Sequence, residues 1–339
     1  MRKNIHIWLL SGLLAMSIFI GGCTSMQTAK VPETPKYPAR PITMIVPFSA
    51  GSAMDITARM LEKDAVNKLG QPLVIVNKPG GTGTIGWNEL VSSSADGYTV
   101  GMSGIDVILQ PLYGATKYNY QTALEPVAQI SPCPLVMVIK GDQPWENVAE
   151  LIDYAKSHPK ELKFGHWGTG SISHVVGQHF AQTTEISLEQ VPFRGGAEAV
   201  TALLGGHVQI AFLSPLSVKE HMKSGTVKVL AVTTEQRLTD PIFAQVPTFK
   251  EQGLDLVISD WFGVVAPKEM PVEIRNKLAK GFEAIITDPG FKKNMENAGL
   301  QVEYLNPQES GVKWLRDNKK LEQLVNETGI LELIKAQKQ

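Results

Sequence analysis

Cysteine is scarce in this chain, with Cys23 and Cys133 the only two among 339 residues. Cys133 stands in the run SPCPL, and no neighbouring residue could act as the base that a cysteine nucleophile needs. We therefore interpret Cys133 as a small buried side chain rather than a catalytic one.

Clusters of basic residues are also missing. The 32 Lys and Arg residues are balanced by 33 Asp and Glu residues, and the sequence contains no basic stripe. Proteins that bind nucleic acid usually have such a patch, because it neutralises phosphates. The composition therefore argues against nucleic acid as a partner.

The apolar run near the N-terminus, Ile7–Ile20, is too short to span a bilayer comfortably. A basic pair precedes it, and Ile-Gly-Gly-Cys follows it, which resembles the lipobox of bacterial lipoproteins. We predict that residues 1–22 are a lipoprotein signal peptide and that Cys23 becomes the lipid-bearing first residue, anchored to a membrane surface. Cys133 then has no partner for a disulfide, so the protein must rely on its core. An ordinary signal peptide with a chance cysteine is the alternative.

The segment 23–39 is polar and rich in proline, which predicts an extended tether. About 300 residues follow, enough for two domains of common size. Apolar runs alternate there with helical patterns, which is typical of α/β lobes with mainly parallel sheets. We expect strands at 42–47, 73–76, 99–102, 135–139, 162–165, 189–192, 210–212, 228–232 and 262–266, and helices at 55–69, 84–92, 148–157, 174–183, 197–204, 273–287, 289–298 and 308–324, with a short one after Gly329.

Two apolar segments, Val127–Ile139 and Asp260–Pro267, can take the chain from one lobe to the other and back. This predicts a first lobe from residues 40–132 plus 263–339 and a second lobe from 133–262. Two crossings between lobes form a hinge, and clefts between lobes are common sites for small ligands.

One construction occurs twice, once in each predicted lobe: an apolar strand, a loop rich in glycine and serine, and an amphipathic helix. The copies are Ile42–Asp55 and Leu162–His174, each followed by its helix. A helix start exposes unpaired N–H groups and the positive end of the helix dipole. Both loops are therefore suited to hold an anion.

Other patterns in the sequence resemble enzyme or metal-binding motifs, but each departs from the motif that it resembles. Asn77–Gly86 contains G-x-G-x-x-G, and Asp106 follows 20 residues further on, which resembles a dinucleotide-binding motif. Four residues, however, separate the preceding strand from the first glycine of the motif. A glycine-rich turn is therefore the better interpretation. Thr82 could still line the cleft. His174 and His179 are five residues apart and lie on different faces of a helix, which argues against a metal site. No nucleotide cofactor or metal is therefore expected, and no Gly-x-Ser-x-Gly elbow is present.

Three side chains near these loops have two interpretations each. Asp55 is either an acid of the first helical turn or a ligand contact. His174 either contacts the ligand or braces its loop. Arg194, between a strand and a helix, either pairs with a carboxylate in the cleft or with a surface acid.

The ordered motifs VPFSAGSAMDITAR, GQPLVIVNKPGGTGTIG, ADGYTV, WGTGSISH, VPFRGGAEAVTALLGGHVQIAF, LAVTTEQR, VPTFKEQGL and WFGVVAP resemble the substrate-binding family of tripartite tricarboxylate transporters, also called the Bug family. The resemblance covers nearly all of the chain after the tether. It implies an extracytoplasmic solute receptor with two α/β lobes of the periplasmic-binding-protein type (type II). Such receptors deliver carboxylates to a separate membrane permease pair.

Carried onto this chain, the resemblance makes Pro47–Asp55 the first ligand loop and Gly168–His174 the second, holding a carboxylate through amides, hydroxyls and waters. Two departures stand out. The first loop has Gly51-Ser52 where the family usually has two glycines, and Trp167 replaces the usual serine in the second. The bulky Trp167 would narrow the cleft or stack in it. The expected ligand-binding residues are Phe48, Ser49, Ala50, Gly51, Ser52, Asp55, Thr82, Ser103, Trp167, Thr169, Gly170, Ser171, His174, Arg194 and Ser214.

We therefore expect an extracytoplasmic lipoprotein that captures a small organic carboxylate between two lobes and delivers it to permease subunits of a tripartite transporter. No bond is made or broken in this function. A ligand sensor that presents its bound form to a membrane receptor is one alternative. An exported enzyme on the same scaffold is another, but no suitable catalytic set is evident in the sequence.

Overall fold

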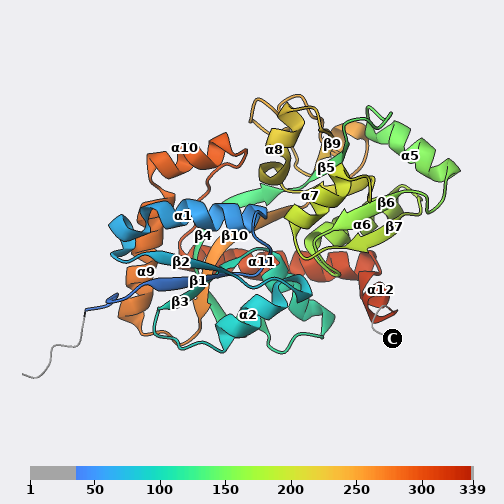
Figure 1. Ribbon diagram of the computed structural model, residues 1–339. Helices are drawn as coiled ribbons and strands as arrows, with labels where there is room; N and C mark the ends of the chain where they lie inside the picture. The colour runs from blue at the N-terminus through green and yellow to red at the C-terminus, as the bar shows by residue number, and fades with distance from the viewer. Residues whose placement is uncertain (1–35, 337–339) are drawn as a thin grey trace, which may run out of the picture. The chain divides into compact units, whose positions relative to one another are not determined.

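The computed structural model describes residues 36–336, and the predicted signal peptide and Cys23 lie outside this range. Within it, Tyr37 and the residues that follow form one unit with two β-sheets (Figure 1). None of the helices in residues 36–336 has the length and apolar character that a membrane span requires.

The first sheet has the strand order β2-β1-β3-β10-β4. Its parallel part joins β1 to β2 on one side and to β3 on the other, while β10 runs antiparallel to both β3 and β4. The strands are β1 (Ile42–Val46), β2 (Leu73–Asn77), β3 (Thr99–Ser103), β4 (Leu124–Pro134) and β10 (Ser259–Pro267).

The second sheet has the order β7-β6-β8-β5-β9. Here β6 runs parallel to β7 and β8, while β5 runs antiparallel to β8 and β9. The strands are β5 (Val136–Lys140), β6 (Lys163–His166), β7 (Glu189–Pro192), β8 (Ile210–Leu213) and β9 (Val227–Val232).

The two α/β lobes are confirmed, but each sheet has two parallel and two antiparallel pairings, so the sheets are mixed rather than mainly parallel. The reason lies in the crossing strands. The chain leaves the first sheet along β4, enters the second along β5, and returns along β10. The parallel strands of each sheet have their carboxyl ends at the cleft between the lobes. A strand that arrives from the other lobe begins at the cleft, so it runs in the opposite direction.

The helices cover the faces of the sheets. α1 and α2 lie on opposite faces of the first sheet (Figure 1), as right-handed crossovers to strands on either side of β1 require. The helical segments are α1 (Ala53–Leu69), η1 (Gly81–Gly83), α2 (Thr84–Val91), α3 (Asp106–Leu109), η2 (Gln110–Tyr113), α4 (Tyr120–Ala123), α5 (Val148–Ser157), α6 (Ile172–Thr183), α7 (Gly196–Leu204), α8 (Pro215–Lys223), η3 (Lys250–Gln252), α9 (Val272–Ile286), α10 (Pro289–Asn297), α11 (Pro307–Glu327) and α12 (Ile330–Ala336).

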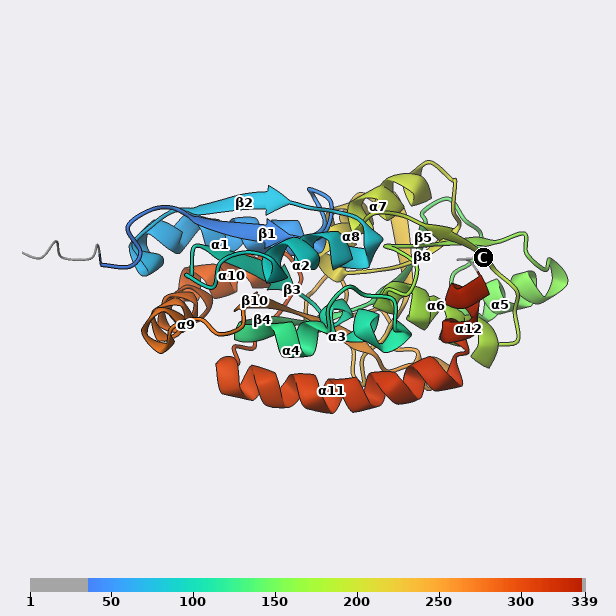
Figure 2. The ribbon, with the colours of Figure 1, turned by 90° about the horizontal axis from the view of Figure 1, so that it is seen from below.

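The long helix α11 contacts both lobes. It packs along β4 of the first sheet and ends near α6 of the second lobe (Figure 2). At that end, Gln182 Nε2 donates a hydrogen bond to the carbonyl oxygen of Thr328, 2.6 Å away. The predicted lobe boundaries at 133 and 262 fall inside β4 and β10, and the division of the chain into these lobes stays a prediction.

Candidate functional site

The first loop is held by Asp55. Gly51, with φ of +78°, turns the chain into α1, and Ser52 caps the helix by accepting a hydrogen bond from the N–H of Asp55. The Asp55 carboxylate accepts 2.9 Å hydrogen bonds from Gly51 N, Arg59 Nε and Asn77 Nδ2. Burial alone would raise the pKa of Asp55, but these hydrogen bonds and the Arg59 charge lower it below its usual value. Its oxygens therefore bind the loop.

The second loop is held in a similar way by His174. Ser171 caps α6, and His174 Nδ1 accepts a 3.0 Å hydrogen bond from the N–H of Gly170. His174 Nε2 therefore has the proton, which it donates to Gln190 Oε1 at 2.5 Å. Burial lowers the pKa of His174 to about 4, so the ring is neutral at pH 7. Of the two interpretations of His174, its contacts are those of a loop brace.

The start of α6 is already occupied by a carboxyl group of the protein. Asp106, directly after β3 in the first lobe, accepts hydrogen bonds from Ile172 N at 2.7 Å and from Trp167 Nε1 at 2.9 Å. Gln110 Nε2 adds a 2.7 Å hydrogen bond to the carbonyl oxygen of Gly170. The second of the two predicted anion sites is thus filled from the opposite lobe in this structure.

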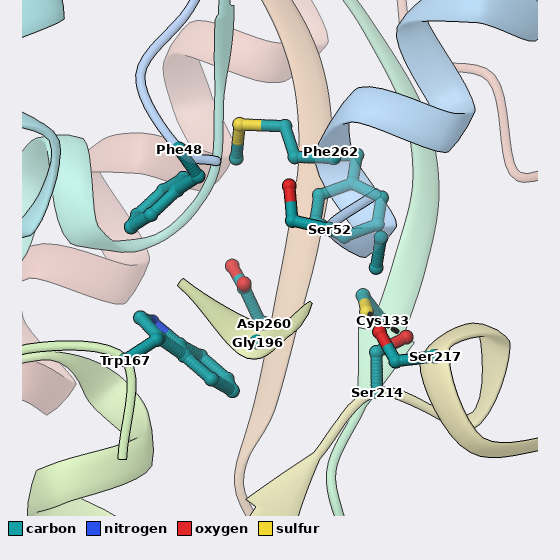
Figure 3. A pocket seen from close by; sticks show the side chains of 11 residues that line it. Phe48, Ser52, Cys133, Trp167, Gly196, Ser214, Ser217, Asp260 and Phe262 are labelled. Atoms are coloured by element: carbon teal, nitrogen blue, oxygen red, sulfur yellow. Dashed lines mark hydrogen bonds between the residues drawn. The ribbon is translucent and has the colours of Figure 1, made fainter. Parts of the chain in front are cut away.

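A cavity of about 40 Å³ lies between the lobes (Figure 3). The starts of three helices reach it: Ser52 at α1, Gly196 at α7 and Ser214 at α8. The crossing strands β4 and β10 contribute further residues. Its lining residues are Phe48, Ser52, Ala53, Met54, Cys133, Trp167, Gly196, Ser214, Ser217, Asp260 and Phe262.

Two buried acids define the electrostatics of this region. Asp260 lines the cavity, and its Oδ1 accepts 2.7 Å hydrogen bonds from the N–H groups of Ile105 and Trp261. Burial raises the pKa of Asp260 to about 7. The pKa of Asp106 is raised to about 8, mainly by burial and to a smaller extent by repulsion from the Asp260 carboxylate. Both carboxyl groups are therefore costly to ionise in this conformation.

Cys133 is buried and lines the cavity beside α8. Its thiol donates to Ser214 Oγ at 3.2 Å. Burial and the nearby Asp260 raise the pKa of Cys133 well above the usual thiol value. These surroundings agree with the interpretation of Cys133 as a buried filler and disfavour the reactive thiolate.

A second cavity, of about 640 Å³, lies between other parts of the two lobes and includes Thr82, Thr169 and Arg194 in its lining. Thr82 Oγ1 donates to the carbonyl oxygen of Thr169 at 3.0 Å. The Arg194 side chain is 75% exposed and pairs with Glu198 at 3.6 Å. The surface ion pair, one of the two interpretations of Arg194, is therefore present.

The fifteen expected ligand residues thus separate into groups. Phe48, Ser52, Trp167 and Ser214 line the smaller cavity, and Thr82, Thr169 and Arg194 line the larger. Gly51, Asp55, Gly170, Ser171 and His174 shape the two loops, and Ala50 is exposed at the tip of the first. The Oγ atoms of Ser49 and Ser103 are buried without a hydrogen-bond partner in the described part of the chain.

Sequence reasoning missed seven residues of the smaller cavity, and Asp260 is the most consequential of them. The sequence did contain a signal for Asp260, because it is a lone acid near the start of the otherwise apolar strand β10. Residues 36–336 contain no group of three or more His, Cys, Asp or Glu side chains placed to hold a metal ion. The others missed are Ala53, Met54, Cys133, Gly196, Ser217 and Phe262.

The two-lobed α/β fold and the cavity between its lobes define a solute-binding protein of the periplasmic type. Residues 57–330 match the model of the tripartite tricarboxylate transporter family receptor. BugT of Bordetella pertussis is 36% identical over 236 residues, which cover 68% of this chain and 72% of BugT.

Solved structures give the same result. The periplasmic binding protein BugD is 30% identical, with a TM-score of 0.83 over 87% of this chain and 99% of BugD. An R. palustris protein solved with adipate has the same TM-score and coverage at 27% identity. The chain belongs to the tripartite tricarboxylate transporter receptor family. Proteins of this family are extracytoplasmic solute-binding receptors rather than enzymes.

Proposed function

We propose that this protein captures a small organic carboxylate between its lobes and delivers it to the permease subunits of a tripartite transporter. The observation that supports this most directly is the cavity where α1, α7 and α8 begin. The first N–H groups of a helix have no partner within it, and the helix dipole adds positive potential there. Three such starts around one cavity favour an anionic ligand.

The size of the cavity agrees with a carboxylate group. A water molecule needs roughly 10–15 Å³ measured in the same way, so about 40 Å³ accommodates about three heavy atoms. A carboxylate has three. The hydroxyls of Ser52, Ser214 and Ser217 line the same cavity and can donate to its oxygens. The adipate-bound relative has a dicarboxylate as its ligand, in keeping with this chemistry.

Capture would proceed by closure of the lobes on the ligand. A ligand that touches both lobes only when they meet shifts the population toward the closed form. The cavity has lining residues from both, such as Ser52 in the first and Ser214 in the second. Contacts of this kind give the ligand a higher affinity for the closed form than for the open form, as closure requires.

A substitution at Gly196 tests this site. An ideal Cβ at Gly196 meets nothing closer than 3.8 Å, and the residue does not have a positive φ, so a larger side chain is compatible with the local backbone. Gly196→Val would fill the cavity with its branched side chain. We expect at least a tenfold loss of affinity, measured by calorimetry, for whichever acid binds the parent protein.

Gly311→Val, in α11, is the matched control, because a Cβ there has its nearest neighbour at 4.0 Å and lies outside the cavity. A thermal-shift screen with mono-, di- and tricarboxylates, aromatic acids and amino acids would identify the ligand, since binding to the native state raises the melting temperature. If a neutral sugar raises it and no acid does, or if Gly196→Val leaves acid binding intact, the proposal is wrong.

We further propose that Cys23 is lipidated and anchors the protein to the membrane surface. The support is the lipobox-like sequence before it. Cell fractionation of a Cys23→Ser variant tests this assignment. The variant should leave the membrane fraction, and unchanged membrane association would contradict it.

A further inference from the structure

The cavity contains an acid for which neither the fold nor a carboxylate ligand provides a partner. Asp260 is only 7% exposed, and it lines the cavity. Its Oδ1 accepts the two backbone hydrogen bonds, whereas no hydrogen bond to its Oδ2 occurs within residues 36–336. Figure 3 shows the carboxyl group extending into the space near Phe48 and Trp167. One oxygen is therefore available to a ligand.

No cation of the described chain neutralises Asp260. Lys313 is close enough to influence it, but Lys313 Nζ is bound to Asp317 Oδ2 at 2.6 Å. The other acid nearby, Asp106, supplies no positive charge, and burial, followed by repulsion from Asp260, raises the pKa of Asp106 itself. A buried acid without a cation is expensive, since desolvation is not repaid by a partner.

The surroundings of Asp260 suit a positively charged group. Phe48 and Trp167 line the same side of the cavity as its carboxyl group (Figure 3). The faces of aromatic rings attract cations, and tryptophan does so most strongly. The indole of Trp167 is fixed by its hydrogen bond to Asp106, so the ring is ordered before a ligand arrives.

The opposite side of the cavity has the chemistry for an anion. Ser214 and Ser217 lie across from Trp167 and Phe48 in Figure 3, at the start of α8. Ser52, at the start of α1, borders the same space. One cavity thus combines an anion-binding side with an acid and two aromatic rings.

We propose that the ligand is a small amino carboxylate, a zwitterion whose ammonium group binds Asp260 beside Phe48 and Trp167 while its carboxylate binds the starts of α1 and α8. This inference rests on the proposed function, because it assumes that a carboxylate binds in this cavity. It adds a second recognition element, which distinguishes amino acids from simple acids of the same length. About 40 Å³ holds the carboxylate alone in this conformation, so the lobes must lie slightly further apart in the bound form, and the shortest amino acids require the least separation.

The test compares pairs of ligands that differ only in the amino group. The probes are glycine with acetate, alanine with propionate, 4-aminobutyrate with butyrate, and phenylalanine with 3-phenylpropionate, each titrated by calorimetry at pH 7.5. In at least one pair, we expect the amino acid to bind at least tenfold more tightly. The variant Asp260→Asn, which keeps the acceptor oxygen for Ile105 and Trp261, should reduce this ratio to below threefold, because the ammonium group loses its charged partner.

Asp288→Asn is the control. It removes an acid that contacts Lys68 and Gly290 and does not line the cavity, and it should leave the ratio unchanged. Phe48→Leu provides a second route if Asp260→Asn fails to fold, since loss of the ring should also lower the ratio. If simple acids bind as tightly as their amino partners in every pair, this inference fails and the proposed function stands. If no acid of either kind binds, both fail.

Discussion

Replacement of Asp106 by asparagine tests the contact through which the first lobe occupies the start of α6. The Asp106 oxygens accept from Ile172 N–H and Trp167 Nε1–H, at 2.7 and 2.9 Å. The asparagine side chain has one acceptor oxygen and one donor nitrogen, so it leaves one of these N–H groups without an acceptor. A buried donor left unpaired costs about 1–3 kcal/mol. The neutral amide, however, avoids the cost of a buried charge beside Asp260.

The pH dependence separates these two effects. In the unfolded chain the Asp106 carboxyl ionises near 3.8, whereas in the folded protein its pKa is raised to about 8. The folded state therefore binds more protons than the unfolded state between about pH 4 and pH 8, so stability falls as pH rises through this window. Each proton contributes at most about 1.4 kcal/mol per pH unit. Between pH 7 and pH 8, we expect Asp106 to lower the free energy of unfolding by about 1 kcal/mol.

Urea denaturation of the parent protein and of Asp106→Asn at pH 7.0, 7.5 and 8.0 measures this slope. The parent should lose about 1 kcal/mol more than the variant over that range. Asp260, with a pKa of about 7, titrates in both proteins, and His174, with a pKa lowered from 6.5 to about 4, affects stability only at more acidic pH. Asp288→Asn is the control, and it should have the same slope as the parent. The pKa of Asp288 is lowered, mainly by the hydrogen bond from Gly290 N–H and to a smaller extent by that from Lys68. Equal slopes in the parent and Asp106→Asn would refute the reasoning.

Two further predictions concern buried groups near the site. His174→Phe removes the acceptor of the Gly170 N–H and the donor to Gln190, so we expect urea unfolding to report a loss of about 1–3 kcal/mol; unchanged stability would mean that His174 does not brace the loop. The Cys133 thiol, whose pKa is raised well above its usual value by burial and by Asp260, should resist iodoacetamide at pH 8 in a Cys23→Ser background until urea unfolds the protein. Mass spectrometry detects the alkylation, and rapid labelling of the native protein would contradict this.

The helix starts of the site could be predicted well because their signals are local. Ser52 and Ser171 cap their helices through hydrogen bonds that span only three residues. The same serines place each start two residues earlier than expected, at Ala53 and Ile172. The start of α8 had an equally local signal, since Ser214 is an N-cap followed by proline, but no helix was expected there.

The partners of these helix starts could not be predicted in the same way. Asp106 and Ile172 are 66 residues apart, and Asp260 and Ile105 are 155 apart. Such contacts depend on how the lobes meet, which no local pattern contains. The predicted effect of Trp167, which was to narrow the cleft or stack in it, followed from its size alone. Trp167 lines the cavity, and its effect on a ligand stays a prediction. The acid that fixes its indole could not be found from local motifs.

The buried acids connect closure of the lobes to the charge of the ligand. When the lobes meet, Asp106 contacts the start of α6, and Asp260 lies beside a small cavity. At pH 7 an empty closed form must keep protons on these acids or bear the cost of their ionisation, and both raise its free energy relative to an open, hydrated form. An ammonium group at Asp260 would repay part of that cost, whereas a simple acid would not. On this reasoning, an amino carboxylate has greater differential affinity for the closed form than its deamino partner, and a larger share of its binding energy shifts the population toward closure.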